Sequence, residues 1–187
     1  MRILIFSQGR CGSTSLTTYI GNSLNLEKIY EPTNPNKNGL IDIESLWKKN
    51  NIVIKIMDWE LKNLKLSFEE LSNKFDKTII LLRENVIEQA ESFYNAIEND
   101  KWTENWKLED IKNFDTNKFY NLKNELELGK NKLLNLKGEH FFYESIFINK
   151  TDINRLNQYL NIQSKKFLYI LSDNYKLRYE KIVNKII

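Results

Sequence analysis

The chain has 187 residues, 41% hydrophobic and 28% charged, which is the balance of a soluble globular protein with one core. The formal net charge of +3 argues against a general nucleic-acid coat but allows a local basic pocket for a small anion. One cysteine excludes an internal disulfide and Cys–Cys metal clusters, and one histidine makes a structural zinc site unfavourable. No apolar run is long enough for a signal peptide or a membrane span, so we expect a cytoplasmic protein.

The first predicted elements are a buried strand over Ile3–Phe6 and a helix over Thr14–Leu24. The stretch that joins them, FSQGRCGSTSL, looks like a Walker phosphate loop, but Ser13 stands where a Walker loop has its lysine. Helix N-terminal N–H groups and the charge of Arg10 still suit an anion. ATP or GTP hydrolysis is therefore a poor fit, and a phosphate without a γ-group fits better. The alternative is an ordinary turn built of small residues.

Predicted strands and helices alternate along the rest of the chain. Short apolar or aromatic runs predict strands over Lys28–Tyr30, Ile52–Met57, Thr78–Leu82 and Glu139–Tyr143. Helical patterns cover Asp42–Lys49, Ser67–Phe75, Asn85–Asn99, Thr151–Leu160 and Tyr175–Ile187. The segment Glu31–Asn36 is predicted to be a loop because it holds both prolines of the chain.

Two helical regions have more specific predictions. Ser67 and Glu70 have the spacing of a capping box. The helix over Asn85–Asn99 is expected to bury the face that carries Val86, Ala90, Phe93 and Ile97. The polar region Trp102–Lys137 is helical in pattern, with a thin apolar stripe of Leu122, Leu126, Leu133 and Leu134.

Strands that alternate with helices predict an α/β domain with a mainly parallel sheet covered by helices on both faces. In such sheets ligands bind beyond the carboxyl ends of the strands. The predicted site is therefore formed by the loops that follow Phe6, Tyr30, Met57, Leu82 and Tyr143.

A second motif lies in the stretch LLRENVIEQAESFY, residues 81–94. Arg83 ends a buried strand, and Ser92 lies on the helix that follows it. Such a pair can hold a phosphate through charge-assisted hydrogen bonds. Alone the motif is weak, because an arginine after a strand is more often the partner of a surface ion pair.

Together, GRCGSTSL and LLRENVIEQAESFY resemble the two phosphate motifs of the sulfotransferases that use 3′-phosphoadenosine-5′-phosphosulfate (PAPS), in particular the carbohydrate and bacterial types. Three weaker segments, YEP, FFYESI and EKIVNKI, are also similar to family segments. The resemblance implies that the first motif binds the 5′-phosphosulfate through Arg10, Cys11, Gly12, Ser13, Thr14 and Ser15. It implies that Arg83 and Ser92 bind the 3′-phosphate.

The resemblance also implies roles for other residues. Glu31, in YEP, matches the glutamate that is the proposed general base of carbohydrate-type members, and Asp58 is the second choice for the base. Lys55 lies in an apolar strand, where the family often has a lysine that faces the sulfuryl group; the alternative is an edge strand with Lys55 in water. Trp102 is a candidate acceptor contact, although tryptophans at such spacing more often pack in a core.

The implied protein is an enzyme: one P-loop-NTPase-like three-layer domain over residues 1–187, with a helical acceptor-side segment over 100–137. It would transfer the sulfuryl group in line from PAPS to a hydroxyl of a carbohydrate, glycolipid or small metabolite, without a metal, and release 3′,5′-adenosine bisphosphate (PAP). A nucleotide kinase-like phosphotransferase, which needs Mg²⁺, is one alternative. A non-catalytic nucleotide-binding relative is the other. The acceptor and the oligomeric state cannot be read from the sequence.

Overall fold

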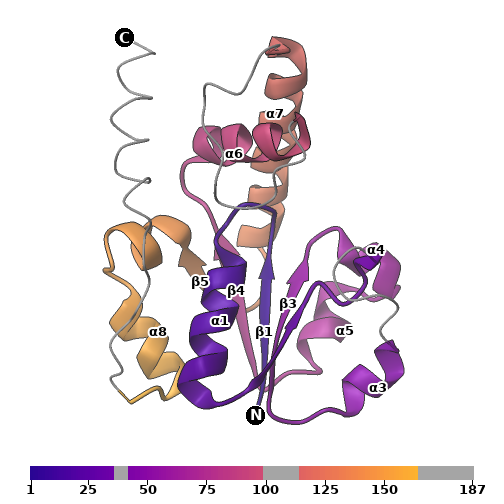
Figure 1. The fold of residues 1–187 in the computed structure, drawn as a ribbon, viewed down its shortest axis with the longest axis vertical. Coiled ribbons are helices and arrows are strands. Elements are labelled where there is room, and N and C mark those ends of the chain that lie inside the picture. The colour runs from indigo at the N-terminus through magenta and orange to yellow at the C-terminus, as the bar shows by residue number, and fades with distance from the viewer. Residues whose placement is uncertain (36–41, 99–113, 164–187) are drawn as a thin grey trace.

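The computed structural model describes residues 1–35, 42–98 and 114–163 (Figure 1). Its centre is a five-stranded sheet in the order β2-β3-β1-β4-β5, and every neighbouring pair is parallel. The strands are β1 (Arg2–Ser7), β2 (Glu27–Tyr30), β3 (Ile52–Met57), β4 (Lys77–Leu82) and β5 (Glu139–Phe142). The predicted α/β class and all predicted strands are confirmed, with small differences at the strand ends.

Most predicted helices are present as well. They are α1 (Ser13–Leu24), α3 (Ile43–Lys48), α5 (Phe68–Ser72), α6 (Val86–Glu98), α7 (Thr116–Leu134) and α8 (Ile153–Leu160). The capping box of α5 is formed as predicted. The short helix α4 (Glu60–Leu64) and the π-helical turn η2 (Glu144–Ile148) were not predicted. Pro35, predicted as loop, is helical, in keeping with the preference of proline for a first helical turn. The predicted helix over Tyr175–Ile187 lies outside the described residues.

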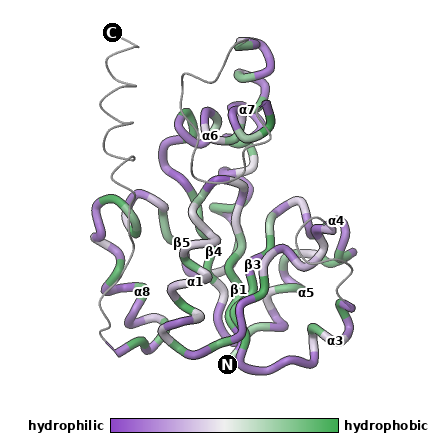
Figure 2. Tube along the Cα trace, in the orientation of Figure 1, coloured by the Kyte–Doolittle hydropathy of each residue, from purple (hydrophilic) through white to green (hydrophobic). Residues whose placement is uncertain are grey.

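Two apolar clusters fix the layers, because alternate strand residues point to opposite faces of the sheet. On one face Ile3, Ile5 and Ile79 pack with residues of α1 and α8. On the other face Leu4 and Phe6 pack with residues of α3, α5 and the end of α7. Strands β1 and β3 are hydrophobic along most of their length (Figure 2). The result is a three-layer α/β arrangement, as predicted.

Helix α6 and the first part of α7 lie together beyond the carboxyl ends of the strands, and the end of α7 reaches the sheet (Figure 1). Their contact buries Ala90, Tyr94, Phe119 and Leu126. The predicted apolar face of α6 was therefore partly wrong: Ile97 is 41% exposed, and Tyr94 is buried in its place. The cause is the position of α7, which determines which side of α6 is covered.

No helix in the described ranges combines the length and the apolar character that crossing a membrane requires.

Candidate functional site

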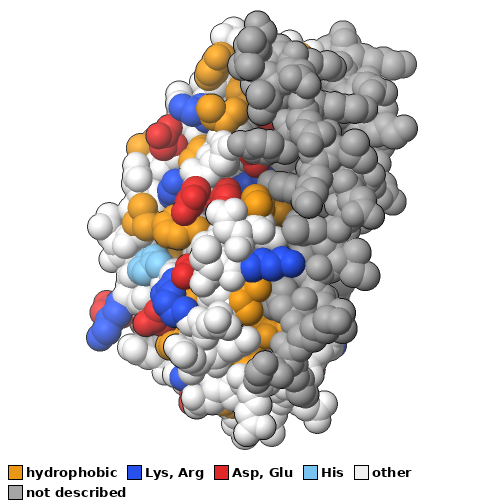
Figure 3. Space-filling view, turned by 90° about the vertical axis from the view of Figure 1, so that its left-hand side faces the viewer, with side chains coloured by type: hydrophobic (Ala, Val, Ile, Leu, Met, Phe, Trp, Pro, Cys, Tyr) orange, Lys and Arg blue, Asp and Glu red, His pale blue; other side chains and the backbone are white. Residues whose placement is uncertain are grey.

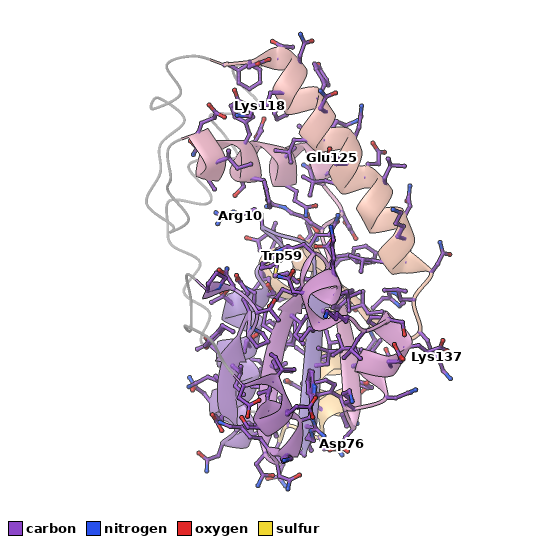
Figure 4. The ribbon with its side chains drawn as sticks, turned by 90° about the vertical axis from the view of Figure 1, so that its right-hand side faces the viewer. Arg10, Trp59, Asp76, Lys118, Glu125 and Lys137 are labelled. Atoms are coloured by element: carbon purple, nitrogen blue, oxygen red, sulfur yellow. The ribbon has the colours of Figure 1, made fainter. Side chains whose placement is uncertain are left out.

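The candidate site lies at the carboxyl edge of the sheet, where the loops after β1, β2, β3 and β4 meet. Arg10 and Trp59 lie toward this end and Arg10 contacts α6, whereas Asp76 lies at the opposite end (Figure 4). Because β1 occupies the middle of the sheet, its loop has neighbours on both sides. The parallel topology therefore gathers the predicted segments as expected.

The loop between β1 and α1 has the backbone of an anion cradle. Arg10 has φ 65° and Gly12 has φ 76°, both in the left-handed region. Gly12 is the N-cap of α1, and a Cβ there would lie 2.8 Å from ring carbons of Tyr143 and Phe147. Left-handed residues in a turn aim successive N–H groups into one concavity, and the N-terminus of a helix adds a favourable dipole. The loop is thus shaped for a compact anion.

Helix α6 holds this loop through side chains on one of its faces. Gln89 Nε2 donates to Gly9 O at 2.8 Å and to Cys11 Sγ at 3.3 Å. Ser92 Oγ accepts a hydrogen bond of 2.8 Å from Arg10 Nε. A Cβ on Gly9 would lie 2.2 Å from the Phe93 ring, so a larger residue there would have to displace this ring or the loop. The loop and α6 form one continuous surface.

Arg83 is a buried arginine that links the second motif to the first. Its Nη1 donates to Arg10 O at 3.2 Å, and its guanidinium lies 4.7 Å from the centre of the Tyr143 ring. It pairs with Glu88 at 2.9 Å and, more loosely, with Glu144 at 3.7 Å. Arg83 is thus an ion-pair partner, but it is a buried one, with 7% exposure, and it also supports the loop between β1 and α1.

Lys55 lies in the interior of the sheet. Strand β3 runs between β2 and β1, so the alternative that Lys55 stands in water on an edge strand is wrong. Its Nζ lies 2.6 Å from Glu31 Oε1 and 2.9 Å from Thr14 Oγ1. A buried ammonium is costly unless it meets an anion, and here the Glu31 carboxylate supplies one. Lys55 thereby joins the loop after β2 to the start of α1.

Glu31 is held in an unusual conformation. Its φ is 47°, and its carboxylate is buried. Its N–H donates to Lys55 O at 2.8 Å, and Asn34 Nδ2 donates to its Oε2 at 2.7 Å. A left-handed residue other than glycine costs about 1–2 kcal/mol, so the surrounding contacts must hold it there. Glu31 is therefore a positioned group and not a surface loop carboxylate.

Asp58 is the other carboxylate of the predicted site. It follows β3, and its N–H donates to Ser7 O at 3.0 Å. Burial raises the pKa of Asp58, while hydrogen bonds from the Trp59 N–H and the Gln8 side chain act in the opposite direction. A carboxyl with a raised pKa is a better proton acceptor near neutral pH. Its neighbour Trp59 is 46% exposed and was not singled out from the sequence, whereas Trp102 lies outside the described residues.

The remaining residues of the loop between β1 and α1 differ in how deeply they are buried. Ser13 is buried, Thr14 is exposed and Ser15 is half-buried. The Cys11 side chain is buried in the core, and burial raises the pKa of its thiol to about 12. Only the backbone of Cys11 can therefore face a ligand of the loop.

Two other polar residues of the site, Glu144 and Gln89, were not predicted from the sequence. Glu144 accepts hydrogen bonds from the N–H groups of Glu84 at 2.9 Å and Asn85 at 3.2 Å, which fixes the entry into α6. Gln89 is fully buried, and a polar residue beside the apolar Ala90 was the one signal that could have revealed it. His140, by contrast, contacts Leu133 O at 3.1 Å, away from these loops. Figure 3 shows the histidine on a face where side chains of both charges are interspersed.

No family model matches the sequence, and a search of curated proteins found no match. The structure is similar to mouse sulfotransferase SULT7A1, solved with PAP, at a TM-score of 0.57 and 16% identity, over 88% of this chain and 59% of that one. It is also similar to shikimate kinase from Bacteroides thetaiotaomicron, at a TM-score of 0.54 and 12% identity, over 86% and 98% of the two chains. The chain has the fold that sulfotransferases and P-loop kinases share. It spans 59% of the length of the mouse sulfotransferase.

Proposed function

We propose that this protein is a PAPS-dependent sulfotransferase that transfers a sulfuryl group to a hydroxyl of a carbohydrate, glycolipid or small metabolite. The observation that carries the proposal is the contact between the two phosphate-type motifs. Arg10 Nε lies 2.8 Å from Ser92 Oγ, and Arg83 Nη1 lies 3.2 Å from Arg10 O. Residues that the resemblance assigns to the two phosphate ends of one nucleotide thus lie on one surface.

Lys55 favours sulfuryl transfer over a kinase reaction. In P-loop kinases the Ser/Thr after the Walker lysine binds Mg²⁺. Thr14 stands at that place here, and its Oγ1 accepts a hydrogen bond of 2.9 Å from Lys55 Nζ. The hydroxyl that would bind Mg²⁺ in a kinase is therefore engaged here by a fixed ammonium. We propose that Lys55 supplies the positive charge that Mg²⁺ supplies in a kinase.

The donor fits the residues present. A 5′-phosphosulfate has no γ-phosphate and needs no Walker lysine, which agrees with Ser13 in that place. The left-handed residues Arg10 and Gly12 curve the loop around a compact anion. The 3′-phosphate would lie against Ser92 on α6 and against Arg83, which precedes this helix. An arginine there can make charge-assisted hydrogen bonds to a phosphate. The mouse sulfotransferase of the same fold was solved with PAP, the product of this reaction.

In the proposed reaction the acceptor oxygen attacks sulfur, and the bond from sulfur to the bridging oxygen of the 5′-phosphate breaks. The acceptor proton passes to a carboxylate, and PAP leaves with the bond's electron pair. Negative charge builds on the bridging oxygen, where Arg10, Lys55 and the loop N–H groups can stabilise it. Preorganised donors of this kind need no rearrangement as the charge develops.

Glu31 is the proposed base, and Asp58 is the alternative. Glu31 lies 2.6 Å from Lys55 Nζ, so an acceptor hydroxyl near it would also be near the proposed sulfuryl position. Asp58 follows β3, where its N–H donates to Ser7 O at 3.0 Å, and its raised pKa would suit a proton acceptor. Separate Glu31→Gln and Asp58→Asn variants decide between them, since the variant that lacks the base loses turnover without losing PAP affinity.

The test is the release of PAP from PAPS, with EDTA present, against a panel of sugar, glycolipid and small hydroxyl acceptors. We expect acceptor-dependent release that falls about 100- to 1,000-fold in Arg10→Gln, the range for loss of one charge-stabilising donor. Lys62→Ala, a change to an exposed lysine on α4, is the control and should leave the rate unchanged. PAP binding without turnover on any acceptor would instead identify a non-catalytic relative.

A further inference from the structure

Glu60 is a carboxylate of 0% exposure beneath the loop that carries Glu31. Its Oε1 accepts hydrogen bonds from Thr33 N and Thr33 Oγ1, both at 2.9 Å. Its Oε2 accepts a hydrogen bond of 2.8 Å from Met57 N. Both carboxylate oxygens are therefore used, one on the loop after β2 and the other on the end of β3.

The loop that Glu60 holds is a tight turn with Glu31 at its first position. Asn34 N donates to Glu31 O at 2.9 Å, which closes the turn over Pro32 and Thr33. Asn63 Nδ2, one helical turn after Glu60, donates to Thr33 Oγ1 at 3.4 Å. Helix α4 thus holds the turn at Thr33 through two of its side chains.

The chemistry of Glu60 is unusual for a purely structural residue. In the part of the chain that the structure describes, its hydrogen-bond donors are neutral groups of Thr33 and Met57. Burial raises the pKa of Glu60, and the nearby Glu31 adds to that effect. A buried carboxylate without a cation is a costly way to attach a loop, since an apolar contact could do so more cheaply. Its directional hydrogen bonds, however, fix the turn in one geometry.

We infer that Glu60 is a positioning residue for Glu31, an inference that rests on the proposed sulfotransferase function. By binding Thr33 and Met57 together, Glu60 sets the turn that keeps Glu31 at φ 47°. In that conformation the Glu31 carboxylate reaches Lys55 Nζ at 2.6 Å. Glu60 contacts neither Lys55 nor the phosphate-type loop, so its effect on the reaction passes through Glu31.

The test compares Glu60→Gln with Thr33→Val and with the control Glu69→Gln, which removes an equal charge from an exposed position on α5. Glu60→Gln places an amide N–H₂ group opposite the donors of Thr33 or Met57, which it cannot accept from. Thr33→Val removes only the hydroxyl of Thr33. The first readout is hydrogen exchange at the N–H of Glu31, which donates to Lys55 O, and needs no substrate. We expect exchange at least about tenfold faster in Glu60→Gln, a smaller change in Thr33→Val, and no change in the control.

The second readout is kinetic. In Glu60→Gln we expect PAP release from PAPS to fall about tenfold or more with PAP affinity within about twofold, the pattern of a lost transition-state contact. Adding Glu60→Gln to Glu31→Gln should cause no further loss, because residues that act through one another are not additive. General destabilisation would lower the rate of the double variant again.

Unchanged exchange at Glu31, or a further kinetic loss in the double variant, would overturn the inference. If Glu60→Gln does not fold, Thr33→Val gives the same comparison with only the two hydrogen bonds of the Thr33 hydroxyl removed, one to Glu60 and one from Asn63. If the wild-type protein neither binds PAP nor releases it from PAPS, the proposed function fails. The exchange rate at Glu31 then still decides whether Glu60 holds the turn.

Discussion

Lys55 Nζ and Glu31 Oε1 lie 2.6 Å apart, and both side chains are buried. Lys55→Met would leave the Glu31 carboxylate buried without its cation, so we expect the free energy of unfolding to fall by about 3–5 kcal/mol. The double variant Lys55→Met/Glu31→Gln should recover most of this loss, because it leaves no unpaired charge. Urea unfolding measures both. A loss below about 1 kcal/mol in the single variant would mean that the pair behaves like an exposed ion pair.

Gly9→Ala tests the contact between α6 and the loop that joins β1 to α1. The added Cβ would lie 2.2 Å from the Phe93 ring, so the ring, the loop or the helix must move. We expect PAP affinity to fall about 10- to 100-fold, the scale of misplacing binding groups by about 1 Å. Phe93→Ala on the same background makes room and should restore much of the affinity in calorimetry. Wild-type affinity in Gly9→Ala would show that the loop geometry does not depend on this contact.

Cys11 should be unreactive in the folded protein. Burial raises the pKa of its thiol to about 12, so almost no thiolate exists at pH 8. We expect alkylation by iodoacetamide to be more than about a thousandfold slower than for an ordinary cysteine of pKa about 8.5. Mass spectrometry reports one site, because the chain has a single cysteine. Urea should restore the ordinary rate, and rapid labelling of the native protein at pH 8 would contradict the buried position.

Asp58 should make stability depend on pH. Burial raises its pKa in the folded state above the unfolded value, so the folded state binds the proton more tightly. Stability from this group is therefore greatest below the unfolded pKa of about 3.9 and falls as pH rises through the window up to the raised folded pKa. Asp58→Asn removes this pH-dependent contribution to stability. Between pH 4 and pH 7, the urea midpoint of Asp58→Asn minus that of wild type should increase as pH rises. A difference that stays constant over this range would contradict the raised pKa of Asp58.

Much of the fold could be predicted because the strands are short, continuously apolar runs. Ile52–Met57 was predicted with its observed bounds. Parallel strands then place their following loops at one edge, which is why Arg10, Lys55 and Arg83 could be expected near one another. Ile97 was misjudged because periodicity defines two candidate faces of α6, and only the packed α7 decides between them.

Glu60 shows what the sequence could not supply. It begins a five-residue helix that is too short for Leu61 and Leu64 to establish an apolar period, and it looks like an ordinary surface acid. Its contact with Thr33 joins residues 27 positions apart and depends on how β2 pairs with β3. Only the folded sheet reveals this relationship.

Calorimetry tests most directly whether the β1 loop and α6 form one site for a 3′,5′-bisphosphate. Wild type and Arg83→Gln are titrated with PAP and with ATP, each with and without Mg²⁺, and Lys62→Ala is the control. We expect PAP to bind without metal and Arg83→Gln to weaken this binding by about 10-fold or more, since a charge-assisted contact is lost. ATP binding that requires Mg²⁺, with no binding of PAP, would contradict the proposed bisphosphate site and favour a kinase.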